Sequence, residues 1–367
     1  MPPIGPRCLS MSCLSLLLAV VVVVLATMLA TFDMITSRGF LPIRVRTALN
    51  SVPFFNSRQH YAFSDLPDNL TGTTILITGA SSGIGHEAAK LMAERGARVV
   101  LGTRGSRARL KSIENSLGPG VAAPSSLDLA SFSSIREFVR SLSDLGVERI
   151  DSVLLNAGKM SFGYEEGELG IERMMAVHHL GHAYLLELLM PLMLASQRPR
   201  VVFVSSSAHV FSYAEGIRFN STPGSFGFYF QAYASRKLAN AVYVRALASR
   251  LEGAYPSKFI VNAVNPGVVT TPFAWYQLYM PSLFSATPRE GALSVLAPLL
   301  DSTAQTDGYY DPLGLRLDWY HDTAYWWTCD ADLRERLWQW TSAVLRDAHR
   351  IVSSTPTGSL ILDRNVL

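Results

Sequence analysis

The sequence has few cysteines and few charged residues. Three cysteines occur in 367 residues, and the spacing of Cys8, Cys13 and Cys329 fits neither a zinc site nor a disulfide framework. This cysteine usage is typical of a reducing compartment. Charged residues make up 17% of the chain, the formal net charge is +3, and no basic cluster is interleaved with aromatic residues. Nucleic acid is therefore not among the expected partners.

A long uncharged stretch lies near the N-terminus. Residues 14–32 are rich in Val and Leu, and as a helix they would extend about 28 Å, which nearly crosses the core of a bilayer. We therefore predict a transmembrane anchor, preceded by an N-terminal tail of residues 1–13. A cleaved signal peptide is the alternative, although its apolar region is usually shorter than this stretch.

The charges beside the predicted anchor indicate its orientation. One arginine precedes it, and four follow it within residues 33–70, a proline-containing segment that we predict to be a juxtamembrane linker. This asymmetry predicts a single-pass protein of an internal membrane, such as the endoplasmic reticulum, with its main domain in the cytosol. If that domain were instead lumenal, Asn69 and Asn220 would be candidate glycosylation sites.

A glycine-rich turn follows a short apolar run within residues 74–85. Gly79 allows a tight turn, Gly83 lets the backbone approach a pyrophosphate, and Gly85 lets a helix pack closely against a strand. The helix predicted from Ile84 would direct its free N–H groups at the phosphates. Because the spacing G-x-x-x-G-x-G differs from the common dinucleotide fingerprint, the turn by itself also fits an ordinary α/β loop.

The end of the next predicted strand, residues 98–103, carries a cation and no acid. Enzymes that bind NAD place a carboxylate there for the ribose hydroxyls, whereas enzymes that bind NADP need a cation for the 2′-phosphate. Arg104 follows the strand, with Arg107 and Arg109 just beyond it. We therefore predict NADP(H) as the cofactor. The alternative is that Arg104 is a solvated loop charge.

Strand and helix patterns alternate through the rest of the chain, without internal repeats. This alternation predicts an α/β fold, a doubly wound parallel sheet (Rossmann fold) covered by helices on both faces. We predict one domain over residues 71–350 and a C-terminal tail, 351–367. Further strands are expected at residues 121–127, 152–156, 200–205, 259–264 and 308–310, and helices from 131 and at 171–195, 231–251, 287–300 and 330–346.

Two residues four apart on a predicted helix are candidates for acid–base catalysis. Tyr233 and Lys237 would lie on one face of that helix. A phenol with a pKa of about 10 is a poor proton donor at neutral pH, but a neighbouring ammonium stabilises the phenolate. Ser206 follows a strand, at the edge where parallel sheets place active sites. Without this context, the Tyr-x-x-x-Lys spacing would equally fit a surface pair.

Seven motifs between residues 70 and 345 resemble those of the short-chain dehydrogenases/reductases, in particular the membrane-anchored, retinol dehydrogenase-like branch. They occur in the order that the family shows: Thr-Gly-Ala-Ser-Ser-Gly-Ile-Gly at 78–85, Leu-Asp-Leu at 127–129, Asn-Ala-Gly at 156–158, His-Leu-Gly-His at 179–182, Val-Ser-Ser at 204–206, Tyr-Ala-Ser-Arg-Lys-Leu-Ala-Asn at 233–240 and Asn-Pro-Gly-Val-Val at 265–269.

The resemblance implies a cofactor site and a role for each catalytic residue. Tyr233 would exchange the proton, Lys237 would lower its pKa and hold the nicotinamide ribose, and Ser206 would bond the substrate oxygen. The cofactor would contact the phosphate loop (Gly79, Ser81, Ser82, Gly83, Ile84, Gly85), the adenine pair Asp128 and Leu129, the turn Asn156, Ala157 and Gly158, and the nicotinamide segment with Pro266, Gly267 and Val269.

Two histidines depart from the family pattern. The family has an asparagine at the position of His178, where it helps to link the lysine to solvent through water. His178, which we count as a catalytic residue, could carry the proton, slow the relay or mark a chain that binds cofactor without turnover. His86 stands where many NADP-using relatives have a lysine or arginine.

His178 and His182 have a metal-binding spacing, but no third ligand is near in sequence, so we predict no metal site.

Residues 268–286 correspond to the family's mobile substrate flap and are rich in aromatic residues. This composition favours a large apolar substrate that arrives from the bilayer, although core packing would explain it as well.

The predicted function is an NADP(H)-dependent oxidoreductase that interconverts a lipophilic alcohol (retinoid, steroid or lipid-derived) and its aldehyde or ketone. The alternative is a cofactor-binding regulatory or scaffold protein whose catalysis is impaired by His178. A homodimer through the long helices is a further expectation from the resemblance.

Overall fold

The computed structural model describes residues 61–223, 225, 227–273, 285–317, 319 and 325–353. The predicted anchor at 14–32, most of the predicted linker, and the predicted tail beyond residue 353 lie outside this part of the chain. Within the residues that are described, no helix combines the length and the apolar character needed to span a bilayer.

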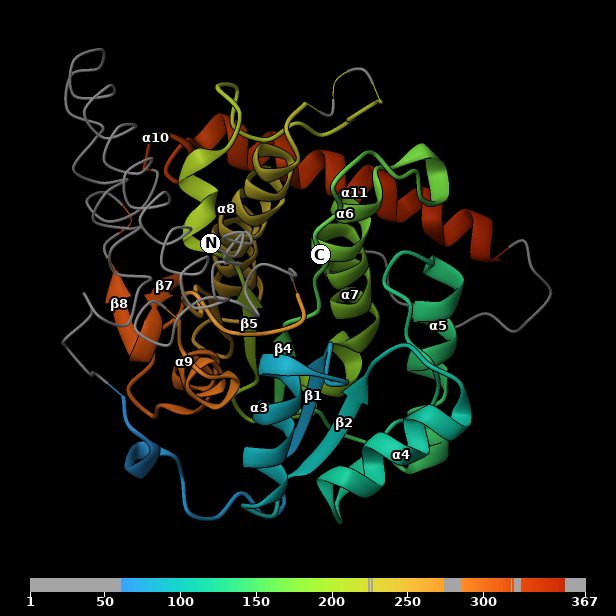
Figure 1. Ribbon diagram of the computed structural model, residues 1–367, viewed down its shortest axis with the longest axis vertical. Helices are drawn as coiled ribbons and strands as arrows, with labels where there is room; N and C mark the ends of the chain where they lie inside the picture. Colours follow the sequence, from blue (N-terminus) through green and yellow to red (C-terminus); the bar gives the residue numbers. More distant parts are fainter. Residues whose placement is uncertain are drawn as a thin grey trace, which may run out of the picture.

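The described residues form an eight-stranded sheet in the order β3-β2-β1-β4-β5-β6-β7-β8 (Figure 1). Neighbouring strands are parallel from β3 to β7, whereas β8 runs antiparallel to β7. The predicted doubly wound α/β fold is confirmed. The strands are β1 (Thr74–Thr78), β2 (Arg98–Gly102), β3 (Val121–Ala122), β4 (Ser152–Leu155), β5 (Arg200–Val204), β6 (Ile260–Val264), β7 (Gly308–Asp311) and β8 (Leu315–Leu317).

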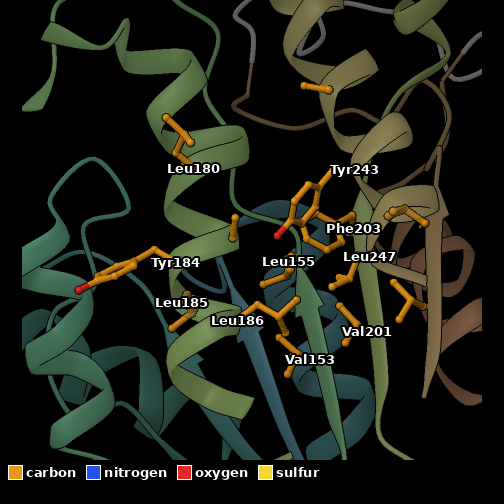
Figure 2. Close-up of a cluster of buried hydrophobic side chains, with 14 of the residues drawn as sticks. Val153, Leu155, Leu180, Tyr184, Leu185, Leu186, Val201, Phe203, Tyr243 and Leu247 are labelled. Atoms are coloured by element: carbon orange, nitrogen blue, oxygen red, sulfur yellow. The ribbon is translucent and has the colours of Figure 1, made fainter. Parts of the chain in front are cut away.

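Helices cover both faces of the sheet. One face carries α3 (Gly83–Ala93), α4 (Arg107–Leu117) and α9 (Pro288–Leu300), and the other carries α5 (Phe132–Arg140), α7 (Gly181–Leu194) and α8 (Tyr229–Ala254). The last helix, α11 (Ala331–Ser353), packs across the outside of α8 and also reaches α5 (Figure 1). Figure 2 shows the core on this second face, where β4 and β5 side chains such as Phe203 meet Leu186 of α7 and Leu247 of α8.

The central strands are apolar on both sides because both faces are covered. Ile75, Leu76 and Ile77 of β1 are all fully buried, which is the continuous pattern expected of a parallel strand between two helical layers. Strand β1 pairs with β2 on one side and with β4 on the other. Connections leave β1 and β4 in opposite directions at this point, which is where open α/β sheets bind ligands.

Side-chain caps fix where two predicted helices begin. The Ser131 side chain accepts a hydrogen bond from Ser134 N at the start of α5. At α9, Thr287 and Glu290 form a capping box, and Pro288 occupies the first turn, where its missing N–H costs nothing. These local signals explain why the starts predicted near residues 131 and 287 are confirmed.

Several predicted elements have different bounds in the structure. The strand expected at 121–127 ends at Ala122, because Pro124 has no N–H to donate to a sheet. The helix expected at 171–195 begins as a short α6 (Arg173–Met175) and a π-helical stretch, Ala176–Leu180, before α7. The strand expected at 308–310 is present as β7, but the sequence did not predict the strand β8, which follows it after the chain reverses at Gly314 (φ +81°). The terminal helix continues to Ser353.

The end of the segment predicted as a linker packs on the domain. Tyr61, Leu66 and Leu70 are buried with residues of α3 and α9. Near the other end of the chain, Trp319 and Trp327 are buried in the core under α8 and α11. Both segments therefore bury further apolar side chains in the core of the domain.

Candidate active site

The phosphate loop and the turn after β4 are packed against each other. Gly79 has φ +73°, and a Cβ there would lie 2.8 Å from Ala157 Cα. A Cβ at Gly85 would lie 2.5 Å from both Asn156 Nδ2 and Gly79 O. These positions admit only glycine at this separation, so the structure brings together two of the predicted cofactor-binding motifs.

The N-terminus of α3 opens directly from this loop. Ser82 is the N-cap residue, but its side chain makes no capping hydrogen bond, which leaves N–H groups of the first turn available to an anionic ligand. His86 Nδ1 lies 3.3 Å from Ala80 O and so braces the loop from within. We call the space beside Gly79 and Gly85, which a Cβ would fill, the cofactor cradle. The cradle and the free N–H groups of α3 together fit the pyrophosphate of a dinucleotide.

The segment with the Asn-Pro-Gly motif lies beside the same loop. A Cβ at Gly83 would come within 3.1 Å of Thr271 Cγ2. Ile84 and Val269 both pack against Gly291 of α9, where a Cβ would come within 3.1 Å of Ile84 Cγ1 and 2.8 Å of Val269 Cγ2. Ile84 and Val269 therefore help to hold the two segments together, while the predicted contacts Ser81, Pro266 and Gly267 remain partly exposed at this edge.

The arginines that follow β2 differ in their partners. Arg107 Nη1 lies 3.5 Å from Glu114 Oε1 and donates a hydrogen bond to Ala123 O. Arg104 and Arg109 are exposed, and among the described residues neither forms an ion pair. Two positively charged side chains without an ion-pair partner in the described chain therefore follow β2, where the adenosine ribose of a dinucleotide would lie.

Asp128 caps its own turn. Its Oδ1 accepts a hydrogen bond from Ala130 N at 3.0 Å, and Oδ2 lies 3.8 Å from Arg173 Nη2. The neighbouring Leu129 is buried against Gly181 of α7, where a Cβ would lie 2.2 Å from Leu129 O. The backbone at 128–129 is thus firmly held, as a platform for an adenine ring would require.

The end of β5 is joined to α8 at the predicted catalytic residues. Lys237 Nζ donates a 2.8 Å hydrogen bond to Val204 O, and Ser205 Oγ donates one of the same length to Lys237 O. Lys237 Nζ lies 5.7 Å from the centre of the Tyr233 ring. Burial lowers the pKa of Lys237 to about 7. The ammonium is therefore held beside the phenol and loses its proton far more readily than in water.

Ser206 is the N-cap residue of the short 3-10 helix Ser207–Phe211. Its Oγ accepts a 3.2 Å hydrogen bond from Ala208 N, and its carbonyl oxygen lies 2.7 Å from His209 Nδ1. Because Oγ also keeps its own proton, it can still donate to an oxygen of a ligand.

His178 is fully buried and its ring meets the Tyr233 ring edge to face, with 5.7 Å between centres. Its Nε2 lies 2.6 Å from Lys159 O and 3.0 Å from Lys159 N. One nitrogen cannot donate and accept at once, and the shorter contact favours donation to the carbonyl. Within the described residues Nδ1 has no hydrogen-bond partner. Burial, with a smaller effect of Lys237, lowers the pKa of His178 well below its usual value, so the ring is neutral.

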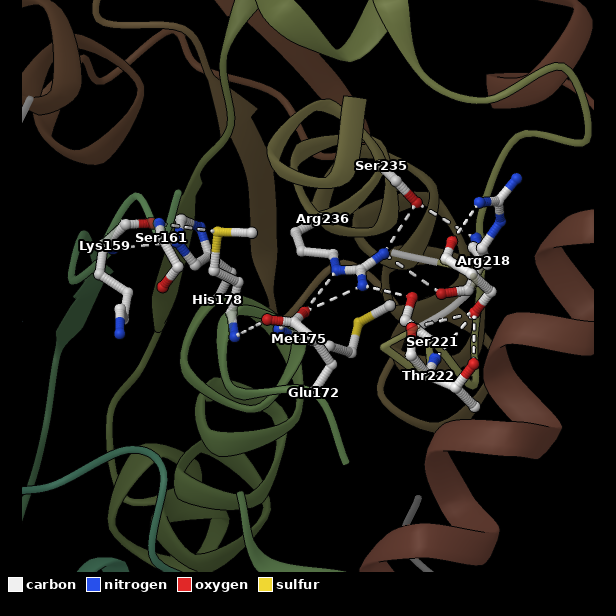
Figure 3. Close-up of polar contacts among 12 residues, drawn as sticks. Lys159, Ser161, Glu172, Met175, His178, Arg218, Ser221, Thr222, Ser235 and Arg236 are labelled. Atoms are coloured by element: carbon white, nitrogen blue, oxygen red, sulfur yellow. Dashed lines mark hydrogen bonds and ion pairs between the residues drawn. The ribbon is translucent and has the colours of Figure 1, made fainter. Parts of the chain in front are cut away.

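A buried ion pair beside this site was not predicted. Arg236 Nη2 lies 2.9 Å from Glu172 Oε2, and both side chains are fully buried. Glu172 also accepts hydrogen bonds from Met174 N and Met175 N, which start α6. Figure 3 shows Arg236 between Glu172 and Ser221, to whose Oγ it donates at 2.7 Å. One feature of the sequence could have indicated this ion pair: Arg236 is a charged residue within an otherwise apolar face of the helix, next to Lys237.

Aromatic side chains stand next to Tyr233. The Phe273 ring lies 5.7 Å from the Tyr233 ring, and Tyr229 contacts both Phe162 and Phe228. Phe162 is 55% exposed and Phe228 is 57% exposed, which is unusual for phenylalanine. Most of the predicted flap, residues 274–284, lies outside the described residues, but its base is held by a 2.8 Å contact between Thr270 Oγ1 and Ser285 Oγ.

The described residues contain no cluster of three or more His, Cys, Asp or Glu side chains that could hold a metal ion. His182 points to Thr78, with 2.9 Å between Nε2 and Oγ1. It is therefore not available as the second ligand of a pair with His178.

Comparison with known proteins places this chain in a family. A family model described as short chain dehydrogenase matches residues 73–279. The chain is 34% identical over 271 residues to human retinol dehydrogenase 14, covering 66% of this chain and 77% of that protein. It is also 37% identical over 210 residues to short-chain dehydrogenase TIC 32 A of Brassica napus, covering 54% of this chain and 64% of that protein. The match thus spans less than two thirds of the plant relative.

Solved structures show the same fold. A crystal structure of a protein from Mycobacterium Paratuberculosis has a TM-score of 0.62 and 27% identity, covering 78% of this chain and 97% of that chain. A short chain dehydrogenase from Escherichia coli CFT073, complexed with NADPH, has a TM-score of 0.51 and 27% identity, covering 66% and 98%. The glycine cradle, the Tyr233–Lys237 pair and these matches together establish that the chain belongs to the short-chain dehydrogenase family of oxidoreductases, in its retinol dehydrogenase-like branch.

Proposed function

We propose that the chain is an NADP(H)-dependent oxidoreductase that interconverts a lipophilic alcohol and its aldehyde or ketone. The observation that carries this proposal is that β5 and α8 hold the Lys237 ammonium beside the Tyr233 phenol, where the carbonyl of Val204 anchors it. A bound nicotinamide cofactor would supply or accept the hydride. Side chains of this protein would orient the substrate and transfer the proton.

In the reducing direction, the Tyr233 hydroxyl would give its proton to the substrate oxygen as that oxygen gains negative charge. Ser206 Oγ would donate a hydrogen bond to the same oxygen and so orient the carbonyl. Lys237 would stabilise the phenolate that remains, and its own depressed pKa would let it pass a proton back near neutral pH. In the oxidising direction the same groups would work in reverse.

The position of His178 limits how it could assist. With Nε2 engaged by the Lys159 backbone, only Nδ1 is left to exchange a proton or to hold a water molecule. The ring therefore acts as an acceptor near Tyr233 and does not pass protons through both nitrogens. The comparisons do not favour the alternative of a scaffold protein without catalysis.

The preference for NADP(H) follows from Arg104 and Arg109, whose charges are not neutralised by a neighbouring carboxylate in the described chain. The Escherichia coli dehydrogenase complexed with NADPH has the same fold, which supports a nicotinamide cofactor, whereas the 2′-phosphate is proposed from the two arginines alone. The exposed rings of Phe162 and Phe228 beside Tyr229 favour an apolar substrate.

The cofactor assignment is tested on the full-length chain in detergent by measuring the Kd of NADPH and of NADH. We expect NADPH to bind more tightly, and Arg104→Ala to weaken NADPH by about tenfold while NADH is unaffected, since a charge-assisted contact is worth about 1.4 kcal/mol or more. Arg107→Ala is the matched control, because Arg107 already pairs with Glu114. A preference for NADH that does not respond to Arg104→Ala would contradict the assignment.

Substrate class is tested by turnover with NADPH on a panel of aldehydes and ketones. Retinal-like, steroidal and long-chain alkenal substrates should be reduced with a kcat/KM at least about tenfold higher than that of short polar aldehydes. The reason is that each additional methylene buried in an apolar site makes binding more favourable. Equal rates across the panel would contradict an apolar site.

We also propose that residues 14–32 anchor the chain in an internal membrane with the domain in the cytosol. Their length and lack of charge support this, as does the arginine excess that follows them. Protease protection on sealed microsomes tests it: the domain should be digested without detergent. Glycosylation at Asn69 or Asn220 would overturn the orientation.

A homodimer, if one forms, should avoid the outer face of α8. There α11 already covers the helix: Trp338 stacks on Tyr243 with 5.5 Å between ring centres, and Arg250 pairs with Glu335 at 2.6 Å. We propose that this face is closed to a second copy. Light scattering of the detergent-solubilised chain gives the oligomeric state, and a crosslink between two copies through an α8 residue that α11 covers would contradict the proposal.

A further inference from the structure

The hydroxyl of Thr78, the last residue of β1, is the centre of a buried network. It accepts hydrogen bonds from the backbone N–H groups of Asn156 at 2.9 Å and Ala157 at 3.0 Å. His182 Nε2 lies 2.9 Å from the same oxygen, and Leu154 O lies farther away, at 3.4 Å. Thr78 and His182 are both fully buried.

The number of hydrogen bonds that a hydroxyl can make fixes the roles in this network. A hydroxyl accepts two hydrogen bonds and donates one. The two backbone N–H groups fill both acceptor positions of Thr78, so its proton is donated, and the nearest acceptor is His182 Nε2. The proton of His182 is then on Nδ1, which lies 3.1 Å from His178 O and donates to it.

The network connects the cofactor loop with the helix that carries His178. Thr78 directly precedes Gly79, and Thr78 O accepts a 2.9 Å hydrogen bond from Asn156 Nδ2. The same Asn156 amide is the group against which Gly85 packs. On its other side, His182 holds the carbonyl of His178 within the π-helical stretch Ala176–Leu180. One imidazole therefore joins three segments that meet under the cofactor cradle.

Burial keeps this imidazole neutral, because it lowers the pKa of His182 to about 3. A protonated ring would have no lone pair to offer Thr78. The donor and acceptor pattern is thus the same at every pH at which the protein is expected to function.

We propose that His182 is a positioning residue for cofactor binding, which acts through Thr78 on the turn 156–158 and on the phosphate loop. This inference rests on the proposed function. It predicts that loss of the imidazole weakens the cofactor without removing any group that touches it.

The test compares His182→Phe with His179→Phe in the full-length chain. His179 is the neighbouring residue, is equally buried, and has a pKa that is also lowered to about 3, but its Nε2 contacts Thr341 Oγ1 of α11 at 2.7 Å. Both variants should lower Tm, since each leaves a buried polar group without its partner. Only His182→Phe should weaken NADPH binding, by about tenfold.

Two further variants separate positioning from general damage. His182→Gln keeps one acceptor and one donor, and we expect it to recover most of the affinity lost in His182→Phe. Thr78→Val should weaken NADPH, and adding His182→Phe to it should cost less than the sum of the single effects, because both remove the same connection. Equal affinity of His182→Phe and wild type, or full additivity with Thr78→Val, would overturn the proposal.

One measurement on the wild type does not depend on whether a variant folds. Nitrogen-15 NMR of selectively labelled histidine should show His182 as the neutral Nδ1–H tautomer between pH 5.5 and 8, with a shift change on addition of NADPH. The opposite tautomer, or no response to a bound cofactor, would also overturn the proposal. If wild type binds neither NADPH nor NADH, the proposed function itself fails, and that outcome is distinct from a wild type that binds while His182→Phe binds equally well.

Discussion

Lys237 Nζ lies 5.7 Å from the centre of the Tyr233 ring and donates a hydrogen bond to Val204 O at 2.8 Å. Val204 is the last residue of β5, so the strand itself fixes the ammonium relative to the phenol. Asn240 Nδ2 approaches the same carbonyl at 3.3 Å. The relative position of the two candidate catalytic groups is therefore set by the sheet and does not depend on a surface loop.

Tyr233→Phe should remove turnover and leave cofactor binding nearly unchanged. The phenol would supply the proton, and loss of a general acid reduces kcat by about 10²- to 10⁴-fold. NADPH affinity should change by less than about threefold, as measured by fluorescence titration. Tyr243→Phe on the same helix is the control, because Tyr243 is buried against Trp338 and away from the site. Full activity of Tyr233→Phe would show that another group transfers the proton.

Gly85→Ala should abolish cofactor binding and lower stability. The new Cβ would lie 2.5 Å from Asn156 Nδ2 and from Gly79 O, so the loop or the turn must move, at a cost of about 1–3 kcal/mol. Gly253→Ala in α8 is the matched control, since no atom lies within 4 Å of its Cβ position. There alanine should stabilise the helix by about 0.5–1 kcal/mol. Denaturant unfolding and NADPH titration measure both effects, and similar behaviour of the two variants would contradict the close packing.

Breaking the buried pair of Glu172 and Arg236 should be strongly destabilising. Arg236→Met leaves a buried carboxylate without its partner, which typically costs about 3–5 kcal/mol. Combining it with Glu172→Gln removes that charge, and the double variant should be more stable than Arg236→Met alone.

The control for this prediction is an exposed ion pair. Arg350 and Asp347 have side chains that are 78% and 57% exposed, so Arg350→Ala should change the free energy of unfolding by less than about 0.5 kcal/mol. A small effect of Arg236→Met, comparable to that of Arg350→Ala, would mean that the buried pair contributes little.

Acid should destabilise the protein below pH 6.5. Burial lowers the pKa of His179 and His182 to about 3 and that of His209 to about 4. Between about pH 4 and 6.5 the unfolded chain therefore binds more protons than the folded one, and acidification favours unfolding. Well above pH 6.5 these histidines are neutral in both states and no longer contribute to the pH dependence of stability.

This prediction is measured as Tm between pH 7.5 and 4.5. The slope below pH 6.5 should become shallower in His179→Phe, which removes one of the buried titrating groups, when each variant is compared with its own value at pH 7.5. A Tm that stays constant from pH 7 to pH 5 would contradict the prediction.

The fold could be predicted well from sequence because its signals are local. The apolar run of Ile75 to Ile77, the cap at Ser131 and the Thr287–Glu290 capping box each act within a few residues. Strand β8 escaped prediction because it is short and depends on pairing with β7 across the reversal at Gly314.

The sequence by itself determined which residues are chemically able to act, since Tyr233, Lys237 and the glycines of the phosphate loop are recognised by type and spacing. The tertiary structure alone decided how the buried polar groups are paired. Thr78 and His182 are 104 positions apart, and Glu172 and Arg236 are 64 apart. No local pattern encodes such pairs, because each forms only when strands and helices pack and exclude the water that would otherwise satisfy these groups.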